Sequence, residues 1–175
     1  MNFQAPSFVF VSACLSLVQA ESYTTPSDCL QLKSHGSCAG RNSSWYYDPS
    51  NKRCKGFLYS GCGGNSNRFV TEKKCLKHCL PGVPVKRICS LPPPKNSCTG
   101  HSLVWSYNPQ KDRCLPYTCG KENKDRNRFK TCQRCMKRCS GQDRRSAKRF
   151  CYELTEGANN ILKAESSVTN TGGPE

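Results

Sequence analysis

Cysteine dominates the chemistry available to this chain, because fifteen cysteines occur in 175 residues. Six of them are separated by 8, 15, 7, 12 and 3 residues: Cys29, Cys38, Cys54, Cys62, Cys75 and Cys79. Five recur 60 positions later, as Cys89, Cys98, Cys114, Cys135 and Cys139, while Cys62 maps onto Glu122. A gap-free repeat of this kind indicates that one small fold was duplicated.

The cysteines favour a disulfide framework in an exported, extracellular protein. An apolar run, Phe8 to Val18, ends in Val18-Gln19-Ala20 and predicts a signal peptide over residues 1–20. Its removal takes Cys14 away and leaves fourteen cysteines, an even number that suits disulfides in an oxidising compartment. Zinc bound by Cys132 and Cys135 is the alternative, but no second pair or histidine cluster accompanies them, so we expect no metal or other cofactor.

The elements that must position these cysteines can be predicted from turn and cap residues. In module 1 (29–79), a strand over 44–47, a turn at 48–51 and a return strand over 53–59 precede a helix over 71–79 that Thr71 caps. Module 2 (89–139) repeats this plan after a linker (80–88). We expect a small disulfide-rich α+β fold of two modules in tandem, each a twisted β-hairpin with a C-terminal helix. Such small units need disulfides for stability.

Residues 140–175 are expected to form a C-terminal tail, first basic and then acidic, without regular structure. The net charge is +5 over residues 21–84, +13 over 85–151 and −3 over 152–175. The excess in module 2 favours an anionic partner: a heparin-like polysaccharide, an anionic membrane surface or an acidic protein patch, whereas no nucleic-acid motif is present. Eight cations are predicted to form one basic face: Lys130, Arg134, Lys137, Arg138, Arg144, Arg145, Lys148 and Arg149.

An enzyme is the weakest functional class. The three histidines, His35, His78 and His101, are scattered, and none has a nucleophile and a carboxylate in a recognisable arrangement. We therefore expect no catalytic residue.

Module 1 resembles the Kunitz family, named for bovine pancreatic trypsin inhibitor. All five cysteine gaps match, as do Phe57-Leu58-Tyr59-Ser60-Gly61-Cys62, Phe69 and the asparagine at position 67. The resemblance implies bridges Cys29–Cys79, Cys38–Cys62 and Cys54–Cys75. It also implies inhibition of a serine protease by a convex loop, which a disulfide holds in its bound shape so that little ordering entropy is lost on binding.

By this resemblance the reactive loop is Cys38, Ala39, Gly40 and Arg41, and Ala39–Gly40 is the bond presented to the protease. Alanine suits a small specificity pocket, as in elastase, rather than the trypsin pocket, which prefers Lys or Arg. Asn42-Ser43-Ser44 is a glycosylation sequon three residues beyond Ala39. A glycan there would obstruct a protease; an unused sequon is the alternative.

For module 2 the resemblance implies bridges Cys89–Cys139 and Cys114–Cys135. Its loop clamp is altered, because Cys119 stands where module 1 has Tyr59 and Cys132 stands where it has Glu72. We predict the pairs Cys98–Cys119 and Cys132–Cys151. Thr99 and Gly100 replace Ala39 and Gly40, and with a re-routed clamp this loop is not expected to inhibit in the substrate-like way.

The tandem plan with a basic second module is similar to salivary anticoagulants of ticks, of the ixolaris type, and to tissue factor pathway inhibitor. That resemblance implies binding of factor X or Xa through an exosite in module 2 and interference with the factor VIIa–tissue factor complex through module 1. We expect the protein to be a monomer. A binding module without inhibition, acting on an ion channel or a polysaccharide, is the alternative.

Overall fold

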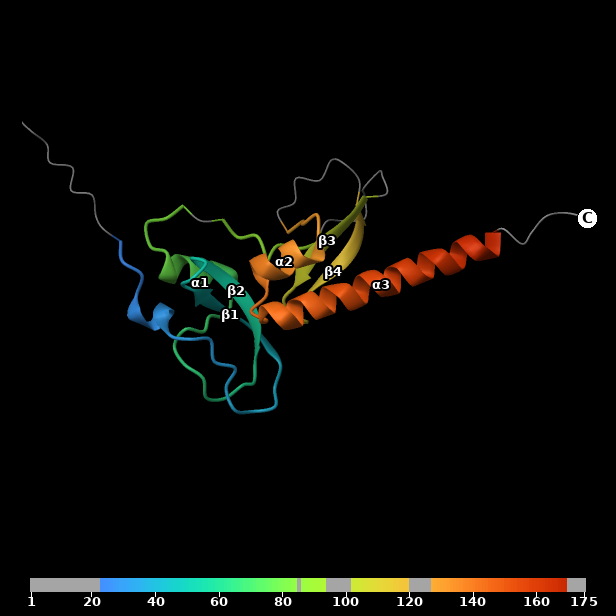
Figure 1. Ribbon diagram of the computed structural model, residues 1–175. Coiled ribbons are helices and arrows are strands. Elements are labelled where there is room, and N and C mark those ends of the chain that lie inside the picture. The colour runs from blue at the N-terminus through green and yellow to red at the C-terminus, as the bar shows by residue number, and fades with distance from the viewer. Residues whose placement is uncertain (1–22, 85, 94–101, 120–126, 170–175) are drawn as a thin grey trace, which may run out of the picture.

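The structure, a computed structural model, describes residues 23–84, 86–93, 102–119 and 127–169. The predicted signal peptide, and Cys98, Thr99, Gly100 and His101 of module 2, lie outside the described residues. The elements are η1 (Ser27–Leu30), β1 (Asn42–Asp48), β2 (Arg53–Tyr59), α1 (Glu72–Cys79), β3 (Ser102–Asn108), β4 (Arg113–Cys119), α2 (Cys132–Cys139) and α3 (Arg144–Thr169), as Figure 1 shows. They confirm the predicted disulfide-rich α+β class.

Each module is built on an antiparallel hairpin, β1 with β2 and β3 with β4. Pro49 suits the first turn because its ring presets the backbone angle, and the N–H of Asn51 donates to the Asp48 carbonyl at 3.3 Å. The aromatic side chains of Trp45 and Tyr47 are buried, as are those of Trp105 and Tyr107 in the second hairpin. The alternation of strand residues therefore places one face of each hairpin in the core.

A short helix closes each module. Thr71 accepts from the Lys74 N–H at 3.1 Å and Thr131 accepts from the Arg134 N–H at 3.2 Å, so both helices begin at their threonine caps. Disulfides fix the helices to the hairpins and to the module starts. The six bridges within the described residues are Cys29–Cys79, Cys38–Cys62, Cys54–Cys75, Cys89–Cys139, Cys114–Cys135 and Cys132–Cys151.

A buried asparagine joins the pieces of each module. The fully buried Asn67 accepts the Tyr47 N–H through Oδ1, and its amide donates to the carbonyls of Cys29, Gln31 and Tyr47. Asn127 makes the equivalent bonds in module 2, to Cys89, Leu91 and Tyr107. Because such buried carbonyls must be paired, one side chain specifies how the entry segment lies against the hairpin.

The expectation of an irregular tail after residue 139 is wrong for α3, a helix of 26 residues. Asp143 begins it by accepting from the N–H groups of Arg145 and Ser146, at 2.9 and 3.0 Å. Ala147, Phe150 and Leu154 pack against the core, and Cys151 is bonded to Cys132 of α2. Capping, an apolar stripe at helical spacing and a covalent anchor therefore stabilise the helix. Figure 1 shows α3 beginning beside α2 and then running away from both modules.

The two modules pack directly on each other. The N–H of Gly141 donates to the Gly56 carbonyl at 2.7 Å, and Lys33 Nζ donates to the Gly141 carbonyl at 2.6 Å. The Trp45 and Tyr107 rings meet edge to face at 6.1 Å between centroids. The linker therefore joins modules that share an interface of backbone, cation and aromatic contacts.

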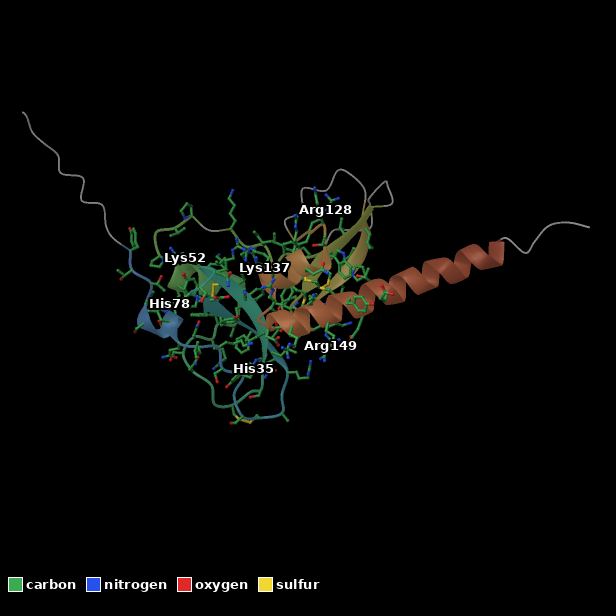
Figure 2. The ribbon with its side chains drawn as sticks, viewed as in Figure 1. His35, Lys52, His78, Arg128, Lys137 and Arg149 are labelled. Atoms are coloured by element: carbon green, nitrogen blue, oxygen red, sulfur yellow. A yellow bond between two sulfur atoms is a disulfide. The ribbon has the colours of Figure 1, made fainter. Side chains whose placement is uncertain are left out.

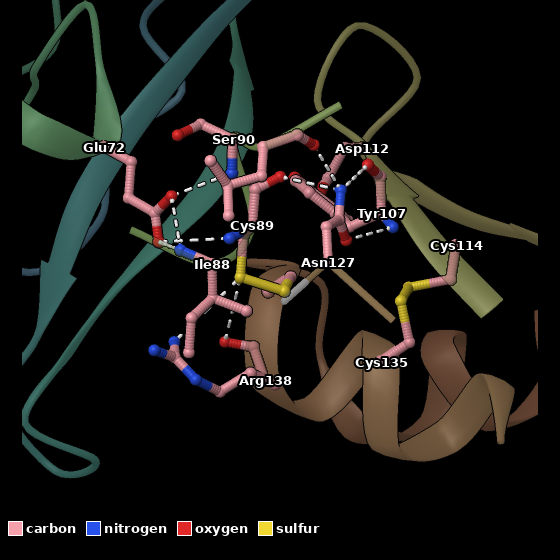
Figure 3. Close-up of a disulfide and its surroundings, with 12 residues drawn as sticks. Glu72, Ile88, Cys89, Ser90, Tyr107, Asp112, Cys114, Asn127, Cys135 and Arg138 are labelled. Atoms are coloured by element: carbon pink, nitrogen blue, oxygen red, sulfur yellow. Dashed lines mark hydrogen bonds between the residues drawn. A yellow bond between two sulfur atoms is a disulfide. The ribbon is translucent and has the colours of Figure 1, made fainter. Parts of the chain in front are cut away.

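The buried carboxylate of Glu72 forms a second part of this junction. Glu72 lies at the start of α1 and is fully buried. It accepts the backbone N–H groups of Ile88, Cys89 and Ser90, the last at 2.8 Å, as Figure 3 shows. The same position in module 2 is Cys132, so each module uses it for a different attachment.

No helix among the described residues is long and apolar enough to cross a membrane.

Candidate functional site

The predicted reactive loop lies between η1 and β1 of module 1. Cys38, Ala39, Gly40 and Arg41 are all exposed, and they precede β1. The Cys38–Cys62 bridge joins this segment to the chain that follows β2, with a Cα–Cα distance of 5.5 Å. The loop is therefore accessible to a protein partner and covalently fixed at one side of Ala39.

Backbone hydrogen bonds hold the loop on both sides of Ala39. On one side the N–H of Cys38 donates to Ser60 Oγ at 3.1 Å, and on the other the N–H of Gly40 donates to the Ser60 carbonyl at 2.8 Å. Further back, the N–H of Ser37 donates to the Cys62 carbonyl at 3.1 Å. Ala39 thus projects from a segment whose two neighbours are bonded to one residue, Ser60. Such a segment has little freedom left to lose on binding.

Two glycines allow this close approach. A Cβ at Gly40 would lie 2.5 Å from the Ser60 carbonyl oxygen, which is too close for any other residue. Gly36 has a φ of +79°, the left-handed region that favours glycine, and a Cβ there would collide with the Cys62 carbonyl. Ring contacts support the base of the loop, where His35 donates to the Leu58 carbonyl at 2.9 Å and meets Phe57 edge to face.

The sequon residue Asn42 is the first residue of β1 and is exposed. Its amide nitrogen lies next to both arms of the loop, 3.6 Å from the Cβ position of Gly40 and 3.5 Å from that of Gly61. N-linked glycans are attached to the asparagine amide nitrogen, so a glycan on Asn42 would begin beside Ala39–Gly40. The structure thus places the sequon within the candidate binding surface.

In module 2, Cys98, Thr99 and Gly100 of the corresponding loop lie outside the described residues, while Cys119, the predicted partner of Cys98, ends β4. The Cys132–Cys151 bridge is present, and both its cysteines are buried. It attaches α3 to α2 and thereby determines where the basic residues of the tail lie.

The eight cations predicted to form one basic face are divided by the structure. Lys137 of α2 and Arg144 and Lys148 of α3 line one cleft. Arg138 points elsewhere and is half-buried, with a guanidinium nitrogen 4.0 Å from Cys89 Sγ, and burial lowers its pKa. Arg149 faces Glu153, with Nε 3.9 Å from a carboxylate oxygen. Figure 2 labels Lys137 and Arg149 on the two helices.

The helical repeat explains this division. Residues four apart share a face, so Arg144 and Lys148 lie together while Arg145 and Arg149 lie together about 100° around α3. Lys130 and Arg134 are exposed before and within the first turn of α2 and do not line the cleft. A charge count along the sequence cannot separate these groups, because the separation depends on how α3 docks.

The junction contains charged groups that sequence reasoning missed. Asp112 is buried and accepts from the Tyr107 hydroxyl at 2.7 Å, and desolvation raises its pKa although Tyr107 and Lys33 act against that rise. Desolvation also lowers the pKa of Lys33. Comparing the repeats gives one signal: Asp112 stands where module 1 has Lys52, and both residues have a positive φ. An acidic residue replacing an exposed lysine marks a position whose surroundings changed.

Comparisons with known proteins agree with this architecture. The family model for the Kunitz/bovine pancreatic trypsin inhibitor domain matches twice, over residues 28–80 and 88–140. Amblin of Amblyomma hebraeum is 36% identical over 150 residues, covering 86% of this chain and 89% of that protein. Carboxypeptidase inhibitor SmCI of Sabellastarte magnifica is 31% identical over 121 residues, covering 69% of this chain and 67% of its own length.

A solved structure of calcicludine is 45% identical, with a TM-score of 0.33, and covers 33% of this chain and 97% of its own. The two family matches together take in more than half of the chain, and each contains a hairpin, a helix and the buried asparagine described above. The chain therefore belongs to the Kunitz/bovine pancreatic trypsin inhibitor family.

Proposed function

We propose that this protein is a secreted inhibitor of serine proteases that acts through the loop Cys38–Arg41 of module 1. The observation that carries the proposal is the constraint on both sides of Ala39, where Cys38 and Gly40 donate to Ser60 and Cys38 is bonded to Cys62. A preorganised, exposed loop binds a cleft with little entropy cost and keeps the ends of a cleaved bond together. A relative named as a carboxypeptidase inhibitor and another named for protease inhibitors support the broader function, inhibition of a protease.

The small side chain of Ala39 determines the expected target. It fills a shallow specificity pocket and leaves the charged base of a trypsin-like pocket unpaired, so an elastase-like protease fits best. Gly40 gives the protease backbone room next to the attacked bond, and Arg41 adds a polar contact beyond it. The tandem plan adds factor Xa or X and the factor VIIa–tissue factor complex as targets, with module 2 binding an exosite in an anti-haemostatic role.

Glycosylation of Asn42 would oppose this function, because the glycan would begin between the two arms of the loop. Protein carrying the Asn42→Gln change and protein made without glycosylation should inhibit equally well. If the glycosylated protein inhibits less than either, the sequon regulates the loop. Equal inhibition by all three forms would show that the sequon has no influence on the loop.

The test is steady-state inhibition of a protease panel on small chromogenic substrates. The panel contains pancreatic and neutrophil elastase, chymotrypsin, trypsin, thrombin, factor Xa and factor VIIa with tissue factor. We expect tight inhibition of an elastase-like enzyme, lost in Ala39→Asp and retained in Thr99→Asp, which makes the same change at the matching position of module 2. If wild type and Ala39→Asp inhibit with equal potency, this loop is not the inhibitory contact.

Binding without inhibition is a second candidate, because module 2 together with its flanking segments carries most of the positive charge, a net +13 over residues 85–151. A polysaccharide or channel surface held by charge should be released by salt, since screening weakens interactions between exposed charges. Binding of a loop in a protease pocket should depend only weakly on the salt concentration, because it does not rest on exposed charges. Retention on heparin at physiological salt without inhibition of any protease would favour this candidate.

A further inference from the structure

A cleft lies where the two modules meet α3. Its volume is about 550 Å³, and its walls come from the turn and β2 of module 1, from α2 and from the first turns of α3. The hydrogen bond between Gly141 and Gly56 and the Cys132–Cys151 bridge hold these three walls together. Neither module could form the cleft alone.

Cations surround this cleft. Lys55 comes from module 1, Lys137 from α2, and Arg144 and Lys148 from α3, and no carboxylate belongs to the lining. Lys55 is partly neutralised by Asp48, whose carboxylate lies 2.8 Å from its ammonium, so the net excess comes mainly from the other three. Cations that converge on a concave surface from separate elements reinforce one another and favour an anionic ligand.

The floor of the cleft is apolar. Two apolar side chains belong to the lining: Met136, which is only 1% exposed and closes the base, and the half-buried Ala147, which is the more accessible of the two. A sulfated polysaccharide has no apolar group to place on such a floor, whereas a peptide can combine carboxylates with one apolar side chain. Apolar anchors in a pocket with a polar rim are the usual arrangement of a peptide-binding site.

We propose that this cleft binds an acidic peptide segment with an apolar residue at its centre, contributed by the target protein. The proposal rests on the binding role proposed above for the basic residues of α2 and α3, and it selects among them: Lys137, Arg144 and Lys148 contact the segment, while Arg138, Arg145 and Arg149 do not. The cleft also includes module 1 through Lys55, so the site belongs to the tandem arrangement rather than to module 2.

The proposal is tested by direct binding with no protease present. The probe is a short fluorescein-labelled peptide of glutamates around a central leucine, titrated with full-length protein and followed by fluorescence anisotropy. We expect Lys148→Glu to weaken binding roughly tenfold, because a rim cation becomes a repulsive charge. Arg149→Glu, the same charge change one residue along α3, should weaken it less than about twofold.

The apolar floor has its own test, which needs no variant protein. A probe whose leucine is replaced by serine should bind about fivefold less tightly, because the apolar contact is lost. Equal losses in Lys148→Glu and Arg149→Glu, no dependence on the leucine, or binding of a heparin oligosaccharide but not of the peptide would each overturn the proposal. Since the assay contains no protease, its failure is separate from a failure of the Ala39 loop.

Discussion

The N–H of Ser90 donates to the carboxylate of Glu72 at 2.8 Å, although the two residues belong to different modules. Glu72 is fully buried and also accepts from Ile88 and Cys89, so one side chain receives the N–H groups of the last linker residue and of the first two residues of module 2. The linker is held to the first module by this contact.

Replacing Glu72 with alanine should destabilise the protein by about 3 kcal/mol, because three N–H groups lose a charged acceptor in a buried place. Guanidinium unfolding of the oxidised protein measures the change. Lys73→Ala, an exposed change on the same helix, is the control and should have an effect within about 0.5 kcal/mol. A Glu72→Ala variant as stable as this control would show that water satisfies these groups equally well.

Gly56→Ala should weaken the contact between the modules. An added Cβ would collide with the hydroxyl and ring of Tyr107, which is too well buried to move aside. We expect a loss of about 2 kcal/mol, typical of overpacking. Gly157→Ala is the matched control, since nothing lies within 4 Å of its Cβ position and alanine favours a helix. The measurement is the guanidinium unfolding midpoint of each variant. Equal midpoints for Gly56→Ala and Gly157→Ala would show that Gly56 and Tyr107 do not pack against each other.

Asp112→Asn should raise stability at neutral pH relative to wild type. Desolvation raises the pKa of Asp112 in the folded state, so folding favours its protonated form. The stability it contributes is present below the unfolded pKa and is lost as pH rises through the folded pKa. Asparagine tolerates the positive φ at this position and still accepts from Tyr107.

The measurement for Asp112 is the urea midpoint of both proteins between about pH 3 and pH 8. The advantage of Asp112→Asn should grow with pH and disappear in acid. A difference that is independent of pH, or that favours wild type increasingly as pH rises, would show that Lys33 compensates fully for the burial of the charge.

The α+β fold could be predicted because its signals are local: cysteine spacing, the Pro49 turn, and the threonine caps at 71 and 131. Helix α3 was missed because the tail was interpreted from its composition, basic and then acidic, although Ala147, Phe150 and Leu154 recur at helical spacing. The predicted Cys132–Cys151 bridge places this stripe against α2, and the stripe gains its stabilising contacts only there.

The junction could not be predicted for a different reason. Glu72, Gly56 and Asp112 look like ordinary surface or strand residues within their own modules. Their roles arise from contacts with the other module, and the orientation of two modules is not encoded in the periodicity of either. The Cys38–Cys62 bridge beside Ala39, in contrast, follows from the family pattern, whereas the hydrogen bonds of Cys38 and Gly40 to Ser60 required the structure.

Removal of the Cys132–Cys151 bridge by serine at both positions should loosen α3. The bridge closes a short loop, 19 residues in sequence separation, and such a constraint contributes roughly 3 kcal/mol. Hydrogen exchange should become faster over residues 144–157 and stay unchanged over 72–79, which serve as the internal control. Unaltered protection of α3 would mean that packing alone holds the helix.

Exchange of the side chain at position 39 tests the proposed inhibition most directly. If Ala39 enters the specificity pocket, Ala39→Arg should lose inhibition of an elastase-like protease and gain inhibition of trypsin, whose pocket carries an aspartate. The same change at Thr99 should produce neither effect. The measurement is the inhibition constant for each enzyme. We expect the constant for the elastase-like protease to rise, and the constant for trypsin to fall, by at least about a hundredfold. If Ala39→Arg leaves both constants unchanged, the loop does not act as a substrate-like inhibitor.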